Sequence, residues 1–231
     1  MTKKNNNQTT KYGNDYLYES PIDTYLCHPL GLFFVDYAYK LGLSPNQITL
    51  LSTIFTLTSC YWIYNNKLKT AVAFYLIGYL FDCIDGRLAR KYNLGSKKGA
   101  AMDMVSDVIT NSVLFITLIV FKRSSLTPIK LSLLLIFFFG ITICHGFTEA
   151  ISSVRKNGSD DFLAPIEKEY GNSTVPLYRL YVQFNKNSYK TYRCMFKEYD
   201  DEKIHKYMKF LKYFGPGSFN IIMAFIILGL K

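Results

Sequence analysis

Residues 82–107 read DCIDGRLARKYNLGSKKGAAMDMVSD, and this stretch decides how the chain folds and which chemistry it can carry. Four carboxylates, three small residues and an arginine follow the pattern D-x2-D-G-x2-A-R-x8-G-x3-D-x3-D inside a strongly apolar region. Residues three, four and seven positions apart share one face of an α-helix. One such face carries Asp82, Asp85, Gly86 and Ala89, with Arg90 at its edge.

The second half of the stretch predicts another helix, with Gly99, Asp103 and Asp107 on one face. Between the two helices, residues 91–98 (KYNLGSKK) are polar, basic and turn-prone, so the helices can fold back on each other. We expect the two acidic faces to meet and the four carboxylates to share one pocket.

Such a pocket needs cations. A carboxylate at membrane depth costs roughly 2.5–3.5 kcal/mol, so four of them cost on the order of 10 kcal/mol without partners. Arg90 is the one basic residue at a fixed position of the pattern, and one guanidinium cannot neutralise four acids. Carboxylates bind divalent ions together with substrate phosphates. Two ions about 4 Å apart, clamping a phosphoryl group for in-line attack, suit this composition.

The segments DCIDGRLAR (82–90) and GAAMDMVSD (99–107) together resemble the complete signature of the class I CDP-alcohol phosphatidyltransferases. The resemblance extends to the surroundings, from about Ser20 to Glu149, and says little about the last third of the chain. It implies an enzyme of phospholipid biosynthesis that transfers a substituted phosphate group from a CDP-linked lipid donor to an alcohol and releases CMP. It also implies a homodimer.

The resemblance assigns roles to the fixed positions. Two Mg2+ or Mn2+ ions are bound by Asp82, Asp85, Asp103 and Asp107, and Asp107 is also the general base. Gly86 and Ala89 leave room for the cytidine moiety. Arg90 contacts the diphosphate or holds the charge of the acceptor; the alternative is a side chain that only reaches the membrane interface.

Two further positions are assigned to substrate binding. Gly99 lets both a neighbouring helix and the nucleotide come close. Ser44 and Pro45 predict a helix start, as an N-cap and a first helical residue. The phrase SPNQIT at 44–49 is similar to the opening of the first transmembrane helix of the family, and this likeness places Asn46 in the nucleotide pocket.

The identity of the substrates stays open between two branches of the family. Residues 102–107 resemble the phosphatidylinositol-synthase branch, whereas residues 81–86 resemble the branch that joins CDP-choline or CDP-ethanolamine to diacylglycerol. The short chain favours CDP-diacylglycerol with a small polar acceptor such as inositol. An ion or solute transporter is a further alternative, because intramembrane acids also relay ions, but a relay does not need Gly86, Ala89, Arg90 and Gly99 at these offsets.

The composition, 49% hydrophobic and 16% aromatic over 231 residues, predicts an all-α, multi-pass integral membrane protein. We expect five or six transmembrane helices, five of them near 46–64, 70–91, 100–121, 129–150 and 216–230, and an N-terminal interfacial amphipathic helix at about 21–41. Residues 1–19 are expected to be a polar tail without a signal peptide, and residues 20–231 a single domain.

Basic residues predict the orientation. With a cytoplasmic N-terminus, the inner segments hold 21 Lys and Arg and the outer segments hold six, so the motif loop opens to the cytoplasm. The net charge of +10 then reflects topology and contact with anionic membrane lipids, and we expect no nucleic-acid partner.

The last third of the chain departs from the six-helix pattern of the family. Residues 151–214 lack an apolar run of span length, so the fifth helix is either degenerate or replaced by an interfacial segment. A basic amphipathic helix on the membrane surface is predicted from the spacing of its apolar residues, Ile204, Tyr207, Met208, Leu211 and Tyr213. The five scattered cysteines are expected to be reduced, and His145 is interpreted as a packing or pocket residue.

Overall fold

The computed structural model describes residues 18–230, apart from the side chain of Lys156. No β-strand occurs within this range, and the all-helical fold class is confirmed. The predicted polar tail lies outside the described residues except for Tyr18 and Glu19.

The described chain forms nine α-helices and three short helical turns. In chain order they are η1 (Asp23–Cys27), α1 (His28–Lys40), α2 (Pro45–Tyr64), α3 (Leu68–Lys91), α4 (Lys97–Phe121), η2 (Arg123–Ser125), α5 (Pro128–Asn157), α6 (Leu163–Tyr170), α7 (Pro176–Met195), α8 (Asp201–Leu211), η3 (Lys212–Phe214) and α9 (Pro216–Leu228). Each of the five predicted spans coincides with a helix, namely α2, α3, α4, α5 and α9.

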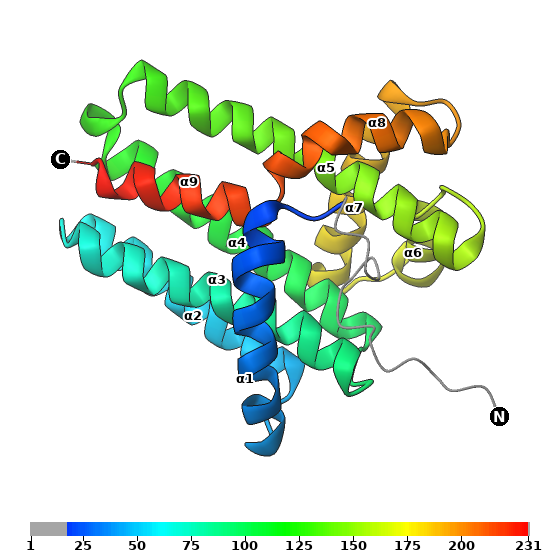
Figure 1. Ribbon diagram of the computed structural model, residues 1–231, viewed down its shortest axis with the longest axis horizontal. Coiled ribbons are helices and arrows are strands. Elements are labelled where there is room, and N and C mark those ends of the chain that lie inside the picture. Colours follow the sequence, from blue (N-terminus) through cyan, green and yellow to red (C-terminus); the bar gives the residue numbers. More distant parts are fainter. Residues whose placement is uncertain (1–17, 231) are drawn as a thin grey trace.

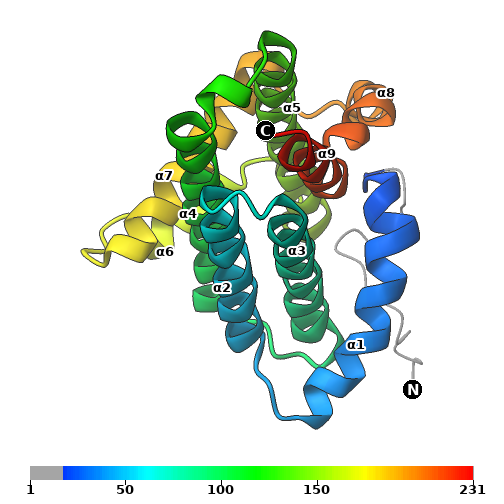
Figure 2. The same ribbon diagram turned by 90° about the vertical axis from the view of Figure 1, so that its left-hand side faces the viewer.

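The helices form a bundle with an attached cap. α2 packs against both α3 and α4, while α1 and α9 pack against α3 (Figures 1 and 2). α7 contacts α4, α5 and α6, and α8 contacts α5. In Figure 1 the cap of α6, α7 and α8 lies at the right-hand end of the molecule, which is also the end where α3 turns into α4. The acidic motif therefore lies at the end of the bundle that the cap adjoins.

Local signals explain where the motif-bearing helices begin. Ser44 forms a capping box with Gln47 at the start of α2, with Pro45 as the first helical residue, as the sequence predicted. The Ser96 hydroxyl accepts a hydrogen bond of 2.9 Å from the Gly99 amide and caps α4. In the turn between α3 and α4, Asn93 adopts a left-handed φ of 53°, which asparagine tolerates better than most residues.

Packing holds α2 and α3 close together. A Cβ atom at Gly78 of α3 would lie 2.5 Å from the Thr56 Oγ1 of α2 and 3.1 Å from the Ser52 carbonyl, so only glycine fits this contact. Beside it, buried apolar residues of α2, α3, α4 and α9 form one core cluster, which includes Ile63 and Leu114. The motif therefore sits on closely packed helices.

Three segments of the described chain are long and apolar enough to cross a membrane: Lys97–Phe121, Pro128–Arg155 and Asp201–Leu228. They correspond to α4, most of α5, and the run of α8, η3 and α9. The count of five or six crossings, and the interfacial position of the helical segment from η1 through α1, stay predictions.

The C-terminal third is helical, and α7 occupies the region where the sequence lacked an apolar run. The predicted amphipathic helix forms as α8, but its apolar residues are divided. Ile204 and Met208 are fully buried in a cluster with α5 residues, whereas Tyr207 and Tyr213 are 48% and 52% exposed. The Tyr207 ring still contacts Phe147 of α5 edge-on, so the apolar residues of this segment differ in burial.

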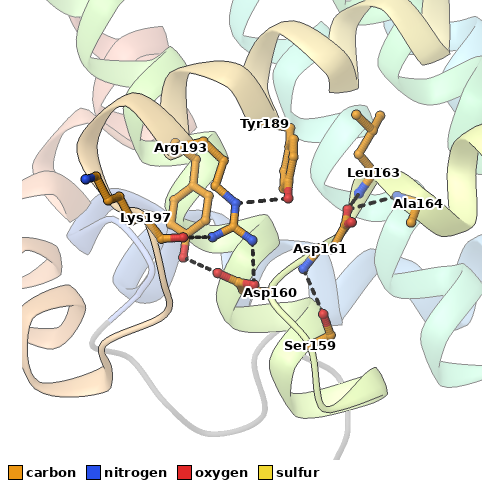
Figure 3. Close-up of polar contacts among 9 residues, drawn as sticks. Ser159, Asp160, Asp161, Leu163, Ala164, Tyr189, Arg193 and Lys197 are labelled. Atoms are coloured by element: carbon orange, nitrogen blue, oxygen red, sulfur yellow. Dashed lines mark hydrogen bonds and ion pairs between the residues drawn. The ribbon is translucent and has the colours of Figure 1, made fainter.

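A polar clamp fixes α7 to the loop that follows α5 (Figure 3). Arg193 Nη2 lies 2.8 Å from Asp160 Oδ1, and the Tyr192 hydroxyl donates to Asp160 Oδ2 at 3.0 Å. Arg193 also donates to the Tyr189 hydroxyl and to the Lys197 carbonyl. Burial, together with the bond to Asp160, raises the pKa of Tyr192 above its ordinary value. The clamp joins two segments more than 30 residues apart in the chain.

Breaking this clamp is expected to loosen α7. Arg193→Gln should lower the melting temperature of the detergent-solubilised protein by roughly 2–6 °C, because a partly buried charge-assisted hydrogen bond contributes about 1–2 kcal/mol. Lys190→Gln removes the same charge from an exposed position of the same helix and is the matched control. Equal melting temperatures for the two variants would contradict a stabilising role for the clamp.

Candidate functional site

Three of the four motif acids converge between α3 and α4. Asp82 and Asp85 come from the last turns of α3, and Asp103 comes from the second turn of α4. One carboxylate oxygen from each lies within 4.8 Å of the others. Asp85 is buried at 4% exposure, while Asp82 and Asp103 are half-buried. The predicted hairpin of two helices therefore does bring acids from both helices together.

Asp107 lies one turn beyond Asp103 on the same face of α4, but it is not part of this tight group. Its side chain is exposed, unlike that of Asp85. The fourth predicted ligand thus stands at the edge of the cluster, on its accessible side. This position suits a group that meets a substrate, and its roles as ligand and base stay predictions.

The sequence interpretation missed Thr49. This residue of α2 is 3% exposed, and its hydroxyl oxygen lies 2.6 Å from Asp85 Oδ2, within hydrogen-bond distance for donation to the carboxylate. The signal was available, because Thr49 follows Asn46 by three residues and so shares its helix face. The phrase SPNQIT at 44–49 contains Thr49, but it does not indicate that the partner of Thr49 is Asp85 of α3.

The residues assigned to the nucleotide lie around the same cluster. A Cβ atom at Gly99 would lie 2.9 Å from Asn46 Oδ1, so the starts of α2 and α4 meet at these two residues. At Gly86, the three atoms nearest to an added Cβ all belong to the Arg90 guanidinium, with Nη1 at 3.1 Å. Gly86 therefore faces a flexible side chain rather than a neighbouring helix. Ala89 is half-buried and Arg90 is exposed.

Arg87, to which the sequence interpretation gave no role, contacts α1 rather than the acidic cluster. It is 1% exposed and donates to the His28 carbonyl of α1 at 3.1 Å. At the end of α3, Asp36 of α1 accepts hydrogen bonds from Lys91 and Tyr92 at 2.5 and 2.6 Å. These bonds lower the pKa of the Asp36 carboxyl. α1 is thus fastened along the motif-bearing half of α3.

The donor set suits a hard divalent cation. Three carboxylates supply only oxygen ligands, which is the preference of Mg2+ and Mn2+. Within residues 18–230, neither Asp82 nor Asp85 forms an ion pair with a basic side chain, and Asp85 is bonded to the neutral Thr49 hydroxyl. The cluster could therefore hold a metal ion.

Comparison with known proteins places the chain in a family. The family model described as CDP-alcohol phosphatidyltransferase matches residues 42–171, more than half of the chain. The protein belongs to the CDP-alcohol phosphatidyltransferase family. The resemblance stated from the motif alone is confirmed.

The chain is also similar in sequence to individual known proteins. An uncharacterized protein of Aquifex aeolicus is 34% identical over 54% of this chain and 64% of its own length. The archaetidylinositol phosphate synthase of Pyrococcus horikoshii is 34% identical over 33% of this chain and 41% of its own. The human CDP-diacylglycerol–inositol 3-phosphatidyltransferase is 36% identical over 32% of this chain and 34% of its own. The matched regions thus span between about a third and just under two thirds of these relatives, and no solved structure matches the chain.

The bond from Thr49 to Asp85 leads to a test of the cluster. Thr49→Val keeps the shape but removes the hydroxyl, and we expect the affinity for Mn2+ to fall by about 10–100-fold, as is typical when a partner that orients a metal ligand is lost. Thr49→Ser should retain the affinity. Thr53→Val is the matched control, because the Thr53 hydroxyl bonds only to the Thr49 carbonyl of its own helix. The Mn2+ concentration that raises the melting temperature half-maximally is the measurement, and equal values for Thr49→Val and Thr53→Val would refute the role.

Proposed function

We propose that the protein transfers a phosphatidyl group from CDP-diacylglycerol to a small polyol such as inositol and releases CMP. The observation that carries this proposal is the convergence of Asp82, Asp85 and Asp103 within a complete family signature. Relatives named for inositol-type synthesis, in an archaeon and in human, support a polyol acceptor. They favour this assignment over transfer from CDP-choline or CDP-ethanolamine to diacylglycerol.

In this proposal the metal is held by Asp82, Asp85, Asp103 and Asp107. Two Mg2+ or Mn2+ ions, when bound, would draw negative charge off the diphosphate of the donor. Thr49 keeps the Asp85 carboxylate oriented for this task, since its hydroxyl bonds to one of the two oxygens.

The remaining roles fall to side chains at the rim. Asp107 takes the proton of the acceptor hydroxyl, whose oxygen then attacks the phosphorus distal to cytidine. The bond from that phosphorus to the bridging oxygen breaks, and CMP leaves with this oxygen. The exposed position of Asp107 supports this role, because an acceptor that arrives from water must be able to reach the base.

Nucleotide and diphosphate contacts come from the residues that surround the acids. Gly86 and Ala89 leave space for cytidine, and Asn46 and Gly99, which lie close to each other, also line the nucleotide pocket in this proposal. Arg90 binds the diphosphate or the charge of the acceptor, and its guanidinium lies against Gly86. We also propose that the site opens to the cytoplasm and that the protein acts as a homodimer, as the family resemblance implies.

The proposed role of Asp107 as general base can be tested by substitution. Asp107→Asn keeps the shape but cannot accept the proton, and we expect CMP release from CDP-diacylglycerol and inositol to fall by at least about 100-fold. Asp201→Asn, which neutralises an exposed carboxylate on α8, should have wild-type activity. To identify the substrates, one assay offers CDP-diacylglycerol with a panel of acceptors. A second assay offers diacylglycerol with CDP-choline or CDP-ethanolamine. Unchanged CMP release in Asp107→Asn, or ion flux through liposomes free of any CDP-alcohol, would overturn the assignment.

Two glycines of α3 form a matched pair for testing the nucleotide pocket. Gly86→Leu should leave the protein folded and able to bind Mn2+, because the atoms nearest to a Cβ there belong to the flexible Arg90 side chain, but CDP should no longer raise its melting temperature. Gly78→Leu should lower the melting temperature without any ligand, since its Cβ would collide with Thr56 and the α2 backbone. If Gly86→Leu instead behaves like Gly78→Leu, Gly86 is a packing residue and the proposed cytidine pocket is wrong.

A further inference from the structure

A second cluster of chemically reactive groups lies beside the acidic motif. The sulfur atoms of Cys27 and Cys83 and a carboxylate oxygen of Asp23 lie within 4.8 Å of one another. Cys27 is buried and ends the π-helical turn η1, directly before α1. Cys83 is half-buried and directly follows Asp82 in α3. A pair of thiols thus bridges α1 and the motif helix.

The backbones of the two helices come close at the same place. A Cβ atom at Gly31, one turn beyond Cys27, would lie 3.7 Å from the Cys83 carbonyl oxygen and 3.0 Å from Arg87 Cδ. A disulfide requires Cα atoms about 4.4–6.8 Å apart, which only such direct contact between helices provides. The proximity of the sulfurs therefore rests on a backbone contact and not only on side-chain orientation.

The carboxylate of Asp23, the third residue of the cluster, already accepts hydrogen bonds from protein groups. Asp23 accepts from the Ser20 hydroxyl at 2.8 Å, from the Gly217 amide at 3.0 Å, and from the Tyr79 hydroxyl. These three donors satisfy its carboxylate and tie η1 to α3 and to the start of α9. Asp23 has no need of a cation, so a thiophilic metal is the weaker interpretation of the cluster, and the two thiols are left facing each other.

We propose that Cys27 and Cys83 form a reversible disulfide when the protein meets a peroxide. The partly exposed Cys83 reacts first: its sulfur takes one oxygen from hydrogen peroxide to give a sulfenic acid, and one water is released. The Cys27 thiol then displaces the hydroxyl group as a second water, and the sulfur–sulfur bond forms. Two thiols are oxidised and one peroxide is reduced to two waters. A dithiol reductant reverses the step.

Formation of the Cys27–Cys83 disulfide is expected to move the neighbouring Asp82. Sulfurs up to 4.8 Å apart must approach to about 2.05 Å, so Cys83 is drawn toward α1 and away from α4. Asp82 precedes Cys83, and metal–ligand distances in bound sites stay within about 0.2 Å of their ideal values, so a shifted Asp82 holds a metal less well. We therefore expect the oxidised protein to bind Mn2+ more weakly. The disulfide itself does not depend on the proposed function, whereas its effect on transfer does.

The experiment treats the purified full-length protein in nanodiscs with hydrogen peroxide and maps disulfides by mass spectrometry without reduction. A Cys27–Cys83 cross-link should form, the Mn2+-induced rise in melting temperature should shrink, and phosphatidyl transfer should fall by about tenfold or more. Dithiothreitol should restore all three. Cys27→Ser and Cys83→Ser should each be insensitive to peroxide, while Cys60→Ser and Cys194→Ser should respond like the native protein.

Four results would overturn the proposal. The first is that oxidised native protein contains no cross-link, and the second is that peroxide still abolishes Mn2+ binding in Cys27→Ser. The third is that the cross-link forms but leaves Mn2+ binding unchanged. The fourth is that the reduced protein contains stoichiometric zinc and that Cys27→Ser does not. Because the cross-link and Mn2+ binding are measured without substrate, failure of the transferase assignment leaves this test intact.

Discussion

Mutual repulsion among the motif carboxylates is the constraint on which the rest of this structure depends. Like charges about 4 Å apart repel by about 4 kcal/mol at an effective dielectric constant of about 20, and Asp82, Asp85 and Asp103 hold oxygens within 4.8 Å of one another. The packing around them must resist this force. α2 and α3 meet so closely at Gly78 that no side chain fits, and Thr49 of α2 lies within hydrogen-bond distance of Asp85. The bundle therefore keeps the acids together, and a divalent cation would convert the repulsion into binding energy.

The N-terminal segment acts from the opposite side of α3. Hydrogen bonds connect this segment to α3. Tyr79 of α3 donates to Asp23 of η1, Arg87 of α3 donates to the His28 carbonyl of α1, and Lys91 of α3 donates to Asp36 of α1. The contacts of Arg87 and Lys91 lie in the half of α3 that bears the motif, and Tyr79 lies three residues before Asp82. α3 is thus held by α2 on its acidic face and by α1 on another face, which leaves the acids little freedom to separate.

Fixed spacing made much of the site predictable. Offsets of three and four residues within a helix determine which side chains share a face, and a polar turn between two helices allows those faces to meet, so the approach of Asp103 to Asp82 and Asp85 followed from the sequence. The start of α2 followed from the cap at Ser44.

Contacts between helices were less predictable. The bond of Thr49 to Asp85 and the proximity of Cys27 to Cys83 depend on how separate helices rotate and pack, which no local pattern specifies. The same limit applies to α8, where Ile204 and Met208 are fully buried against α5 while Tyr207, which touches Phe147 of α5 by its ring edge, stays 48% exposed.

α7 packs against the bundle through buried polar side chains as well as through aromatic residues such as Tyr192. Asn185 is 1% exposed, and its amide donates to the Tyr181 carbonyl at 2.9 Å and to the Met104 sulfur of α4 at 3.3 Å. Tyr192, equally buried, donates to Asp160. Since buried polar groups destabilise a fold only when they lack partners, these contacts let α7 pack against α4 and α5. Met104 follows Asp103 directly. α7, which lies where the sequence predicted either a degenerate fifth helix or an interfacial segment, therefore contacts the residue next to the acidic cluster.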